Sequence, residues 1–356
     1  MKDIIELLHL GKENNASDVH LIVGCPPLLR VNGELQAVDG EYPLTPEEIK
    51  HSFTQLTTRK QRDGFERTME LDFGYDLEGV GRIRCNAARQ RGAISFALRI
   101  LPFEIPTIDS LELSQKYKDM ALSPRGLVII SGPTGSGKST TLAAMIHHIN
   151  LNRACHIVTI EDPIEYTHPN IKSAITQREL GYDTLSFVSA LKYVLRQDPD
   201  VILVGEMRDY ETAAAVLSVA ETGHLVLTTG HAPSATQAIE RVVDMFPPQQ
   251  RYFAQIRLAS LMIGVFYQTL VPRADGSGRI AAVEIMLGTP AVHNLIREGK
   301  IYQLPNIIRT SSKDGMQTLD QALIDYYRQG VITGETLIRY CNDPDEVEKL
   351  VGKVAV

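Results

Sequence analysis

A glycine-rich loop in the middle of the chain constrains the fold more than any other feature. Its residues fit the pattern G-x-x-x-x-G-K-[ST] and are Gly132, Pro133, Thr134, Gly135, Ser136, Gly137, Lys138, Ser139 and Thr140. Glycines let the backbone turn its N–H groups inward around phosphates, and a following helix directs the positive end of its dipole at them. We expect Lys138 to reach the β- and γ-phosphates and Ser139 to supply a hydroxyl to Mg²⁺. The loop therefore predicts a nucleotide site.

The residues around the loop provide the context that this motif requires. Short apolar runs alternate with stretches of helical spacing, a pattern typical of a parallel α/β sheet. The runs that we expect to be buried strands are residues 126–131, 156–160, 201–204 and 224–228. The first of them leads directly into the glycine-rich loop. A simple glycine turn is therefore the weaker interpretation.

The first hundred residues predict a different, mixed α+β unit. Apolar residues at 4, 5, 7 and 8 indicate a short amphipathic helix, and Thr45-Pro46 indicates the start of another. Asn32-Gly33 is a strong hairpin signal between two short strands. Further strands are expected at residues 17–23, 71–75, 82–89 and 93–101. From about Pro290 onward the chain reads as mostly helical.

Composition limits the possible partners and compartment. The chain has 356 residues, enough for two domains, and its 36 Lys and Arg against 43 Asp and Glu give a net charge of −7. A net negative charge is a poor match for a general DNA binder. The four cysteines are scattered, which argues against a zinc site and indicates a reducing, cytoplasmic setting. No apolar run approaches the roughly 18 residues of a membrane span, so we expect membrane contact only through a partner.

Acidic residues follow two of the predicted strands. Glu161, Asp162 and Glu165 come after the strand at 156–160, and Glu206 follows the strand at 201–204. Open α/β sheets bind ligands at the carboxyl ends of their strands, where a hydrolase needs a base to orient water and Mg²⁺ needs acidic partners. The second segment has the form of a Walker B site. A solvated turn for the first group, and a helix N-terminal acid for Glu206, are the alternative interpretations.

Two histidines lie near the ends of the strand after Walker B. His224 precedes this strand and His231 follows it. A lone histidine is usually structural, but this pair could sense the γ-phosphate or bridge it to the neighbouring domain. The sequence leaves both possibilities open.

Together these motifs resemble the secretion and type IV pilus motor ATPases, and most of all the pilus retraction ATPases of twitching motility. The resemblance covers nearly the whole chain. Its segments are SDVHL at 17–21, the phosphate loop, the Asp box IEDPIEY at 160–166, RQDPDVILVGEMRD at 196–209, the His box ETGHLVL at 221–227 and GMQTLD at 315–320.

The resemblance implies an α/β fold with four parts. These are a PAS-like N-terminal α+β domain at 1–102, an interdomain linker at 103–122, a RecA-like P-loop NTPase domain at 123–289 and a C-terminal helical segment at 290–356. It also implies ATP and Mg²⁺ as cofactors. The family's site residues map to Glu161, Asp162 and Glu165 in the Asp box, to Glu206 in Walker B, and to His224 and His231 in the His box. Glu165 is our choice for the general base, and Ser139 and Glu206 would hold Mg²⁺, partly through water.

The resemblance further implies two arginine fingers and a ring assembly. Arg84 and Arg99 match N-terminal-domain arginines that act on the phosphates; without the family they would read as surface charges. The implied function is a cytoplasmic homohexameric ATPase that drives an inner-membrane platform protein, with pilin disassembly and retraction as the result. The alternatives are an accessory subunit that partners a second retraction ATPase, an extension or secretion ATPase, and a DNA-translocating motor.

Sequence details favour retraction over extension. The extra N-terminal domains and four-cysteine zinc loop that extension motors usually carry are not found, and residues 291–298 resemble the AIRNLIRE segment of retraction motors. By pattern alone this segment would be an ordinary amphipathic helix. Two departures from the family pattern are Ala232-Pro233 after His231 and the histidine at 293.

Overall fold

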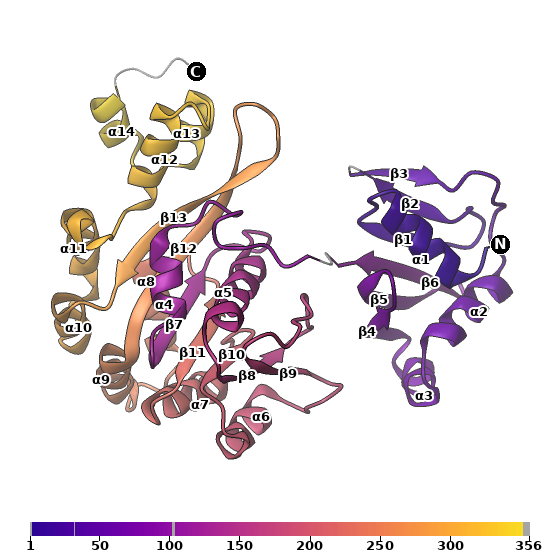
Figure 1. Cartoon of the computed structure of the whole chain (residues 1–356), viewed down its shortest axis with the longest axis horizontal. Coiled ribbons are helices and arrows are strands. Elements are labelled where there is room, and N and C mark those ends of the chain that lie inside the picture. The colour runs from indigo at the N-terminus through magenta and orange to yellow at the C-terminus, as the bar shows by residue number, and fades with distance from the viewer. Residues whose placement is uncertain (1, 32, 102–103, 352–356) are drawn as a thin grey trace. The chain divides into compact units, whose positions relative to one another are not determined.

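The computed structural model describes residues 2–31, 33–101 and 104–351 (Figure 1). The chain divides into two compact units. The first comprises Met1–Glu104 with Pro163–Thr167, and the second comprises Ile105–Asp162 with His168–Val356.

The first unit is built on a six-stranded antiparallel sheet with the order β3-β2-β1-β6-β5-β4. Its strands are β1 (Asp18–Leu21), β2 (Leu28–Val31), β3 (Glu34–Ala37), β4 (Glu70–Leu77), β5 (Gly81–Gln90) and β6 (Ala93–Ile100). Its helices are α1 (Ile4–Glu13), α2 (Pro46–Leu56) and α3 (Arg59–Thr68). The apolar faces of the helices and sheet form one core, in which Phe53 packs against Phe65 and Phe96.

Local signals explain where these helices begin. Thr45 and Glu48 form a capping box at the start of α2, with Pro46 in the first turn. Thr58 and Gln61 form the same arrangement at α3. The hairpin between β2 and β3 is present, with Gly33 at φ 89°, whereas Asn32 lies outside the described residues.

The second unit is built on a seven-stranded sheet with the order β13-β12-β7-β11-β10-β8-β9. Its strands are β7 (Gly126–Ser131), β8 (His156–Glu161), β9 (Ala174–Glu179), β10 (Val201–Val204), β11 (Leu225–Gly230), β12 (Met262–Pro272) and β13 (Arg279–Leu287). All neighbours pair in parallel except β12 and β13. The carboxyl ends of β7, β8, β10 and β11 therefore share one edge of the sheet.

Helices cover both faces of this sheet. They are α4 (Gln115–Ala121), α5 (Lys138–Asn152), α6 (Phe187–Val194), α7 (Tyr210–Glu221), α8 (Ala235–Asp244) and α9 (Arg251–Leu261). The connection from β7 through α5 to β8 runs toward the β9 edge of the sheet, whereas the connections through α6 and α7 run back toward β7. Because such crossovers are right-handed, α5 lies on one face of the sheet, and α6 and α7 lie on the other. The strands buried between these layers are almost entirely apolar, as parallel strands require.

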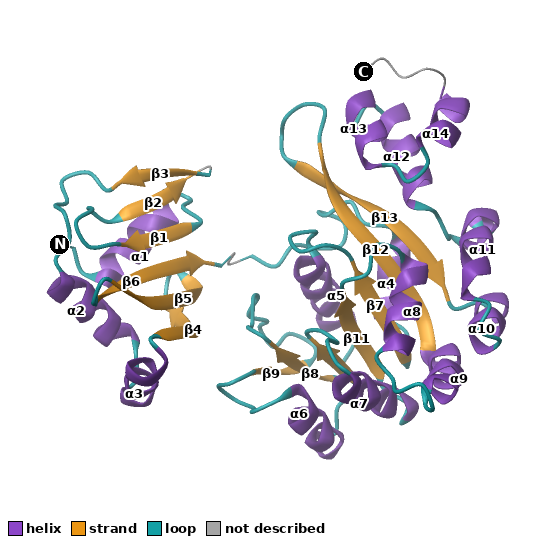
Figure 2. Ribbon diagram, turned by 180° about the vertical axis from the view of Figure 1, so that it is seen from behind, coloured by secondary structure: helices purple, strands orange, loops and turns teal. Residues whose placement is uncertain are grey.

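The antiparallel pair β12–β13 extends toward the C-terminal helices (Figure 2). The helices after it are α10 (Pro290–Arg297), α11 (Leu304–Thr310), α12 (Leu319–Arg328), α13 (Gly334–Tyr340) and α14 (Pro344–Val351). Val271 and Ile280 near the outer end of the pair form a small separate core with Leu323 of α12 and Leu337 of α13. The C-terminal helices are thus anchored on β12 and β13.

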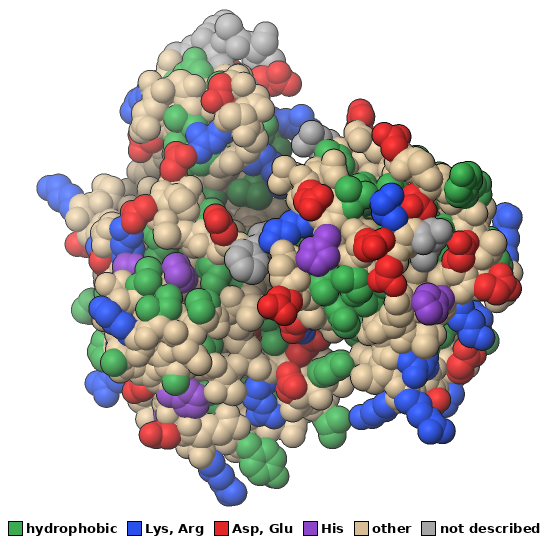
Figure 3. All heavy atoms as spheres, turned by 45° about the vertical axis from the view of Figure 1, so that its right-hand side comes forward, with side chains coloured by type: hydrophobic (Ala, Val, Ile, Leu, Met, Phe, Trp, Pro, Cys, Tyr) green, Lys and Arg blue, Asp and Glu red, His purple; other side chains and the backbone are tan. Residues whose placement is uncertain are grey.

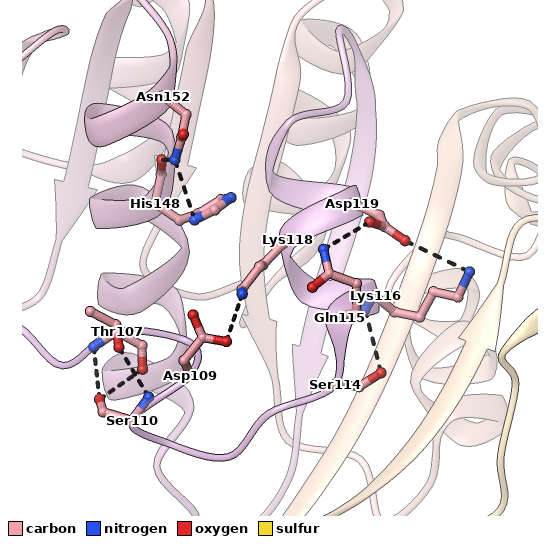
Figure 4. A network of polar contacts seen from close by, with 10 residues as sticks. All are labelled: Thr107, Asp109, Ser110, Ser114, Gln115, Lys116, Lys118, Asp119, His148 and Asn152. Atoms are coloured by element: carbon pink, nitrogen blue, oxygen red, sulfur yellow. Dashed lines mark hydrogen bonds and ion pairs between the residues drawn. The ribbon is translucent and has the colours of Figure 1, made fainter.

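Residues 105–122, part of the expected linker, fold against the second unit. Tyr117 of α4 is fully buried and stacks on Phe266 of β12, with ring centroids 4.1 Å apart. Figure 4 shows the polar contacts of this segment, including the Lys118–Asp109 ion pair at 2.6 Å and the turn closed by Thr107 and Ser110.

The predicted α/β class is confirmed, with a mixed first unit and a mainly parallel sheet in the second. Each predicted strand and helix start named above is present, with shifts of one or a few residues at the ends. The sequence interpretation left three elements unassigned that matter for the site: β9, β12 and β13.

Candidate nucleotide-binding and catalytic site

The phosphate loop joins β7 to α5 and uses its glycines where the backbone demands them. Gly132 has φ 150°, and a Cβ there would lie 2.3 Å from the carbonyl oxygen of Gln268. Gly137 has φ 85° and occupies the N-cap position of α5. Both positions exclude an L side chain, so the loop can adopt this path only with glycine.

The loop presents several donors that fit a phosphate. No side chain within the described residues caps the N-terminus of α5, so its first N–H groups are available to an anion. The buried Ser136 Oγ has no hydrogen-bond partner among the described residues. Lys138 Nζ donates to the carbonyl oxygens of Gly132 and Pro133, both at 2.9 Å, and thus lies over the loop. The residues present therefore fit a nucleotide phosphate.

Gln268 of β12 hydrogen-bonds to the phosphate loop and to α5, and the sequence interpretation missed it. Its Nε2 donates to the Ser136 carbonyl at 2.6 Å, and its Oε1 accepts from Thr141 Oγ1 at 3.0 Å. Its side chain is buried, and it joins β12, the loop and the first turns of α5. The run of β-branched and aromatic residues around Gln268 was the signal that could have identified its strand.

Glu161 lies at the carboxyl end of β8, on the same sheet edge as the loop. Its Oε1 accepts from Thr159 Oγ1 at 2.6 Å and from Gln177 Nε2 of β9 at 3.1 Å. The ends of β8 and β10 lie close together, since the Gly205 N–H donates to the Ile160 carbonyl at 2.8 Å. Asp162 follows and is exposed to solvent.

Glu206 follows β10 and forms a compact cluster with His231 and Arg208. His231 Nε2 lies 3.3 Å from Glu206 Oε2, and Arg208 forms an ion pair with Glu206 Oε1. Glu206 is buried, whereas Arg208 is largely exposed. Thr229 Oγ1 donates to the Gly205 carbonyl at 2.6 Å and so joins the ends of β10 and β11. The sequence interpretation did not single out Arg208.

The structure separates the two predicted histidines. His231 lies at the carboxyl end of β11, with Glu206, whereas His224 precedes the first residue of the same strand. With about 3.3 Å per residue, the strand places them on the order of 20 Å apart. The His224 ring lies within hydrogen-bonding distance of Thr222 Oγ1, at 2.9 Å, on the edge opposite the phosphate loop. Its assignment to the nucleotide site stays a prediction that this geometry does not support.

Glu165, Arg84 and Arg99 belong to the first unit. Glu165 is half-buried in the segment 163–167. Arg84 of β5 and Arg99 of β6 are directly opposite each other in the antiparallel register. Two like charges at such positions repel, and each here has a carboxylate partner, Asp72 at 3.0 Å from Arg84 and Asp18 at 2.9 Å from Arg99.

The charge of Arg99 affects the ionisation of its partner Asp18. Burial raises the pKa of Asp18, but hydrogen bonds from Ser17 and Arg99 and the charge of Arg99 outweigh it, so the pKa is lowered. Asp18 also lies 4.0 Å from Arg30 of β2. The carboxylate thus stays ionised and holds Arg99 on the sheet face.

The chemistry of the donor set also fits Mg²⁺. Within the described ranges no group of three or more His, Cys, Asp and Glu side chains forms a ready-made metal site. Mg²⁺ bound with nucleotides characteristically uses one or two protein oxygens, waters and the phosphates. Ser139, half-buried in the first turn of α5, and Glu206 at the same edge provide such oxygens.

Comparison with known proteins shows consistent similarity over the chain. A family model described as "Type II/IV secretion system protein" matches residues 95–339. The type IV pilus retraction ATPase PilT of Pseudomonas aeruginosa is 44% identical over 333 residues, 94% of this chain and 96% of that protein. The type IV pilus ATPase PilU of the same organism is 41% identical over 346 residues, 97% of this chain and 90% of that protein.

A solved structure agrees with the sequence comparisons. The crystal structure of the pilus retraction motor PilT with bound ADP superposes with a TM-score of 0.92 at 41% identity, covering 98% of this chain and 100% of that one. The likeness extends through both the N-terminal and the RecA-like ATPase parts. The chain therefore belongs to the type II/IV secretion system protein family.

Proposed function

We propose that this chain is a Mg²⁺-dependent ATPase, converting ATP and water to ADP and phosphate, that powers retraction of type IV pili. One observation carries the proposal: the uncapped phosphate loop and the Glu206–His231 pair lie at the same edge of one parallel sheet. The similarity to PilT over nearly the whole chain supports the same function.

Each site residue has a distinct task in this proposal. The N–H groups at the start of α5 and Lys138 bind the phosphates, and Ser139 and Glu206 hold Mg²⁺, partly through water. Mg²⁺, when bound, neutralises charge on the phosphate oxygens. Glu165 orients the attacking water as general base, with Glu161 and Asp162 completing the acidic group.

The arginines would couple hydrolysis to motion. Arg84 and Arg99 are neighbours on one sheet face and already balance each other's repulsion through Asp72 and Asp18. An anionic phosphate can take over that balancing role. We propose that both arginines reach the phosphates when the N-terminal unit and an ATPase unit close together, and withdraw when they open.

The proposed assembly is a homohexamer acting on an inner-membrane platform protein. We place it in the cytoplasm, bound to the membrane only through that partner. None of the helices in the described parts of the chain has the length and apolar character needed to cross a bilayer.

A DNA-translocating motor is the less supported proposal. Acidic and basic side chains are interspersed over the face drawn in Figure 3, and the net charge is −7. Lack of stimulation by DNA in the ATPase assay would eliminate this alternative.

A second retraction role is supported by the comparably high identity to PilU. In that case the chain would bind nucleotide but work mainly as the structural partner of a second motor. Autonomous turnover by the purified protein, together with loss of twitching on its deletion alone, favours the primary motor. Turnover only with the second ATPase favours the accessory role.

Steady-state phosphate release tests the enzymatic proposal. Lys138→Ala and Glu206→Gln are expected to abolish turnover. The matched controls are Lys118→Ala and Glu112→Gln, which remove an ion-paired lysine and an ion-paired glutamate elsewhere in the same unit. Near-normal turnover by the first pair of variants, or equal losses in the controls, would refute the assignments.

A further inference from the structure

Glu284 lies in the middle of β13, and its carboxylate is buried without an ion-pair partner among the residues described. Such a charge is costly unless hydrogen bonds or dipoles compensate it. Burial accordingly raises the pKa of Glu284, as does the nearby charge of Asp320, while two backbone N–H groups oppose the rise. The buried carboxylate therefore depends on backbone N–H groups, such as that of Ala235, to compensate its charge.

The backbone N–H groups near Glu284 belong to the first residues of two different helices. The Ala235 N–H, at the first position of α8, donates to Glu284 Oε1 at 2.6 Å. The Leu319 N–H, at the first position of α12, lies near enough to lower the pKa of Glu284. The next residue of β13, Ile285, exchanges two backbone hydrogen bonds with Gln317 just before α12, at 2.8 and 3.2 Å. The caps Ser234 and Thr318 satisfy other N–H groups of these helices, so Glu284 adds a shared charge at both positive helix ends.

The start of α8 is only a few residues from the candidate catalytic cluster. His231 contacts Glu206 at 3.3 Å. The next residue, Ala232, exchanges two hydrogen bonds with Ser131 Oγ, both at 2.9 Å, and Ser131 directly precedes the phosphate loop. Residues 231–235 are thus tied to Walker B at one end, to the phosphate loop in the middle and to Glu284 at the other end.

The exposed Pro233 fits this arrangement. The hydrogen bonds that fix the segment come from Ala232 and Ala235, so Pro233 can lack an N–H without cost. With φ restricted by its ring, Pro233 makes the segment stiffer, and a displacement at Ala235 is passed to His231 rather than absorbed.

We infer that Glu284 is a positioning residue that fixes residues 231–235, and with them His231 against Glu206, and joins this segment to α12 of the C-terminal helices. This inference rests on the proposed ATPase function. A shift of α12 during the motor cycle would then reach the Glu206–His231 geometry through β13 and Glu284.

Glu284→Gln tests the inference because it keeps the shape but turns one oxygen into a donor that faces an N–H group. We expect kcat to fall about tenfold, less than the roughly 100-fold loss that a misplacement of about 1 Å can cause. The dissociation constant for ADP should change less than about twofold, because the phosphate loop itself is intact. Tyr326→Phe is the matched control: it removes another bond between α12 and β13, from Tyr326 Oη to the Ala281 carbonyl at 3.0 Å, and leaves α8 untouched. Its kcat should stay at the wild-type value.

A double-mutant cycle with His231→Ala separates positioning from general stability. If Glu284 acts through His231, Glu284→Gln has little further effect on kcat in the His231→Ala background. If the kcat losses of Glu284→Gln and His231→Ala multiply in the double variant, the inference is overturned. An equal loss of kcat in Tyr326→Phe would also overturn it. Should Glu284→Gln fail to fold, the same cycle is read on Glu284→Asp, whose shorter side chain withdraws the carboxylate from the Ala235 N–H.

Hydrogen–deuterium exchange provides a readout independent of turnover. Glu284→Gln should speed exchange at the starts of both α8 and α12, whereas Tyr326→Phe should affect α12 alone. Unchanged protection at α8 would overturn the link between the two helices. Wild-type protein without any turnover would instead refute the proposed function, so the two failures are distinguishable.

Discussion

The strongest structural prediction concerns Gln268, which we expect to hold the phosphate loop in its binding conformation. Gln268→Met keeps a similar volume but removes the donor to the Ser136 carbonyl and the acceptor for Thr141. A buried polar group left without a partner costs about 1 to 3 kcal/mol. Thr141 can redirect its hydroxyl to the carbonyl one turn earlier in α5, so the Ser136 carbonyl accounts for most of the cost.

That cost falls mainly on the loop because the Ser136 carbonyl belongs to it. If the loop bears about 1.4 kcal/mol, the dissociation constant for nucleotide rises about tenfold. Titration calorimetry with ADP measures this directly. Gln317→Met is the matched control, since Gln317 Nε2 also donates to a backbone carbonyl, that of Val283 at 2.8 Å, on β13. Wild-type affinity in Gln268→Met, or an equal loss in Gln317→Met, would show that Gln268 does not hold the loop.

Three further predictions follow from individual positions. Gly132→Ala should abolish nucleotide binding, because its Cβ would lie 2.3 Å from the Gln268 carbonyl oxygen; normal ADP titration would contradict this. Burial, aided by the charge of His147, lowers the pKa of His168 to about 4. The unfolded chain takes up this proton near pH 6.5, so stability falls as pH drops from there toward 4, by up to about 3 kcal/mol. Urea unfolding should show a smaller loss between pH 7 and 4.5 for His168→Asn than for wild type. Arg84→Gln breaks an exposed ion pair, so stability should change by less than about 1 kcal/mol while kcat falls; an unchanged kcat would exclude the finger role.

Elements with strong local signals could be predicted from the sequence. The glycine-rich motif defined the junction of β7 and α5, and Thr45-Pro46 defined the start of α2, because each signal lies within a few adjacent residues. The same holds for Glu161 and Glu206, since the carboxyl ends of parallel strands meet at one edge.

Contacts over long sequence distances could not be predicted in this way. Gln268 lies 132 residues from Ser136, and Glu284 lies 49 from Ala235. Gln268 lies on β12 and Glu284 on β13, and the sequence interpretation left both strands unassigned. Asp275-Gly276 between the two strands is a turn signal, and in the structure Ser277 N donates to Asp275 Oδ1 at 2.9 Å. Periodicity alone also could not tell which end of β11 faces the nucleotide, so His224 and His231 were predicted together although only His231 contacts Glu206.

ATP turnover by the purified full chain, measured as steady-state phosphate release with and without Mg²⁺, shows whether this sheet edge is catalytic. We expect Mg²⁺-dependent turnover in wild type and Glu112→Gln, and none in Glu206→Gln, whose carboxylate lies beside His231 at the edge that also carries the phosphate loop. Turnover that persists in Glu206→Gln would show that this sheet edge is not the catalytic site.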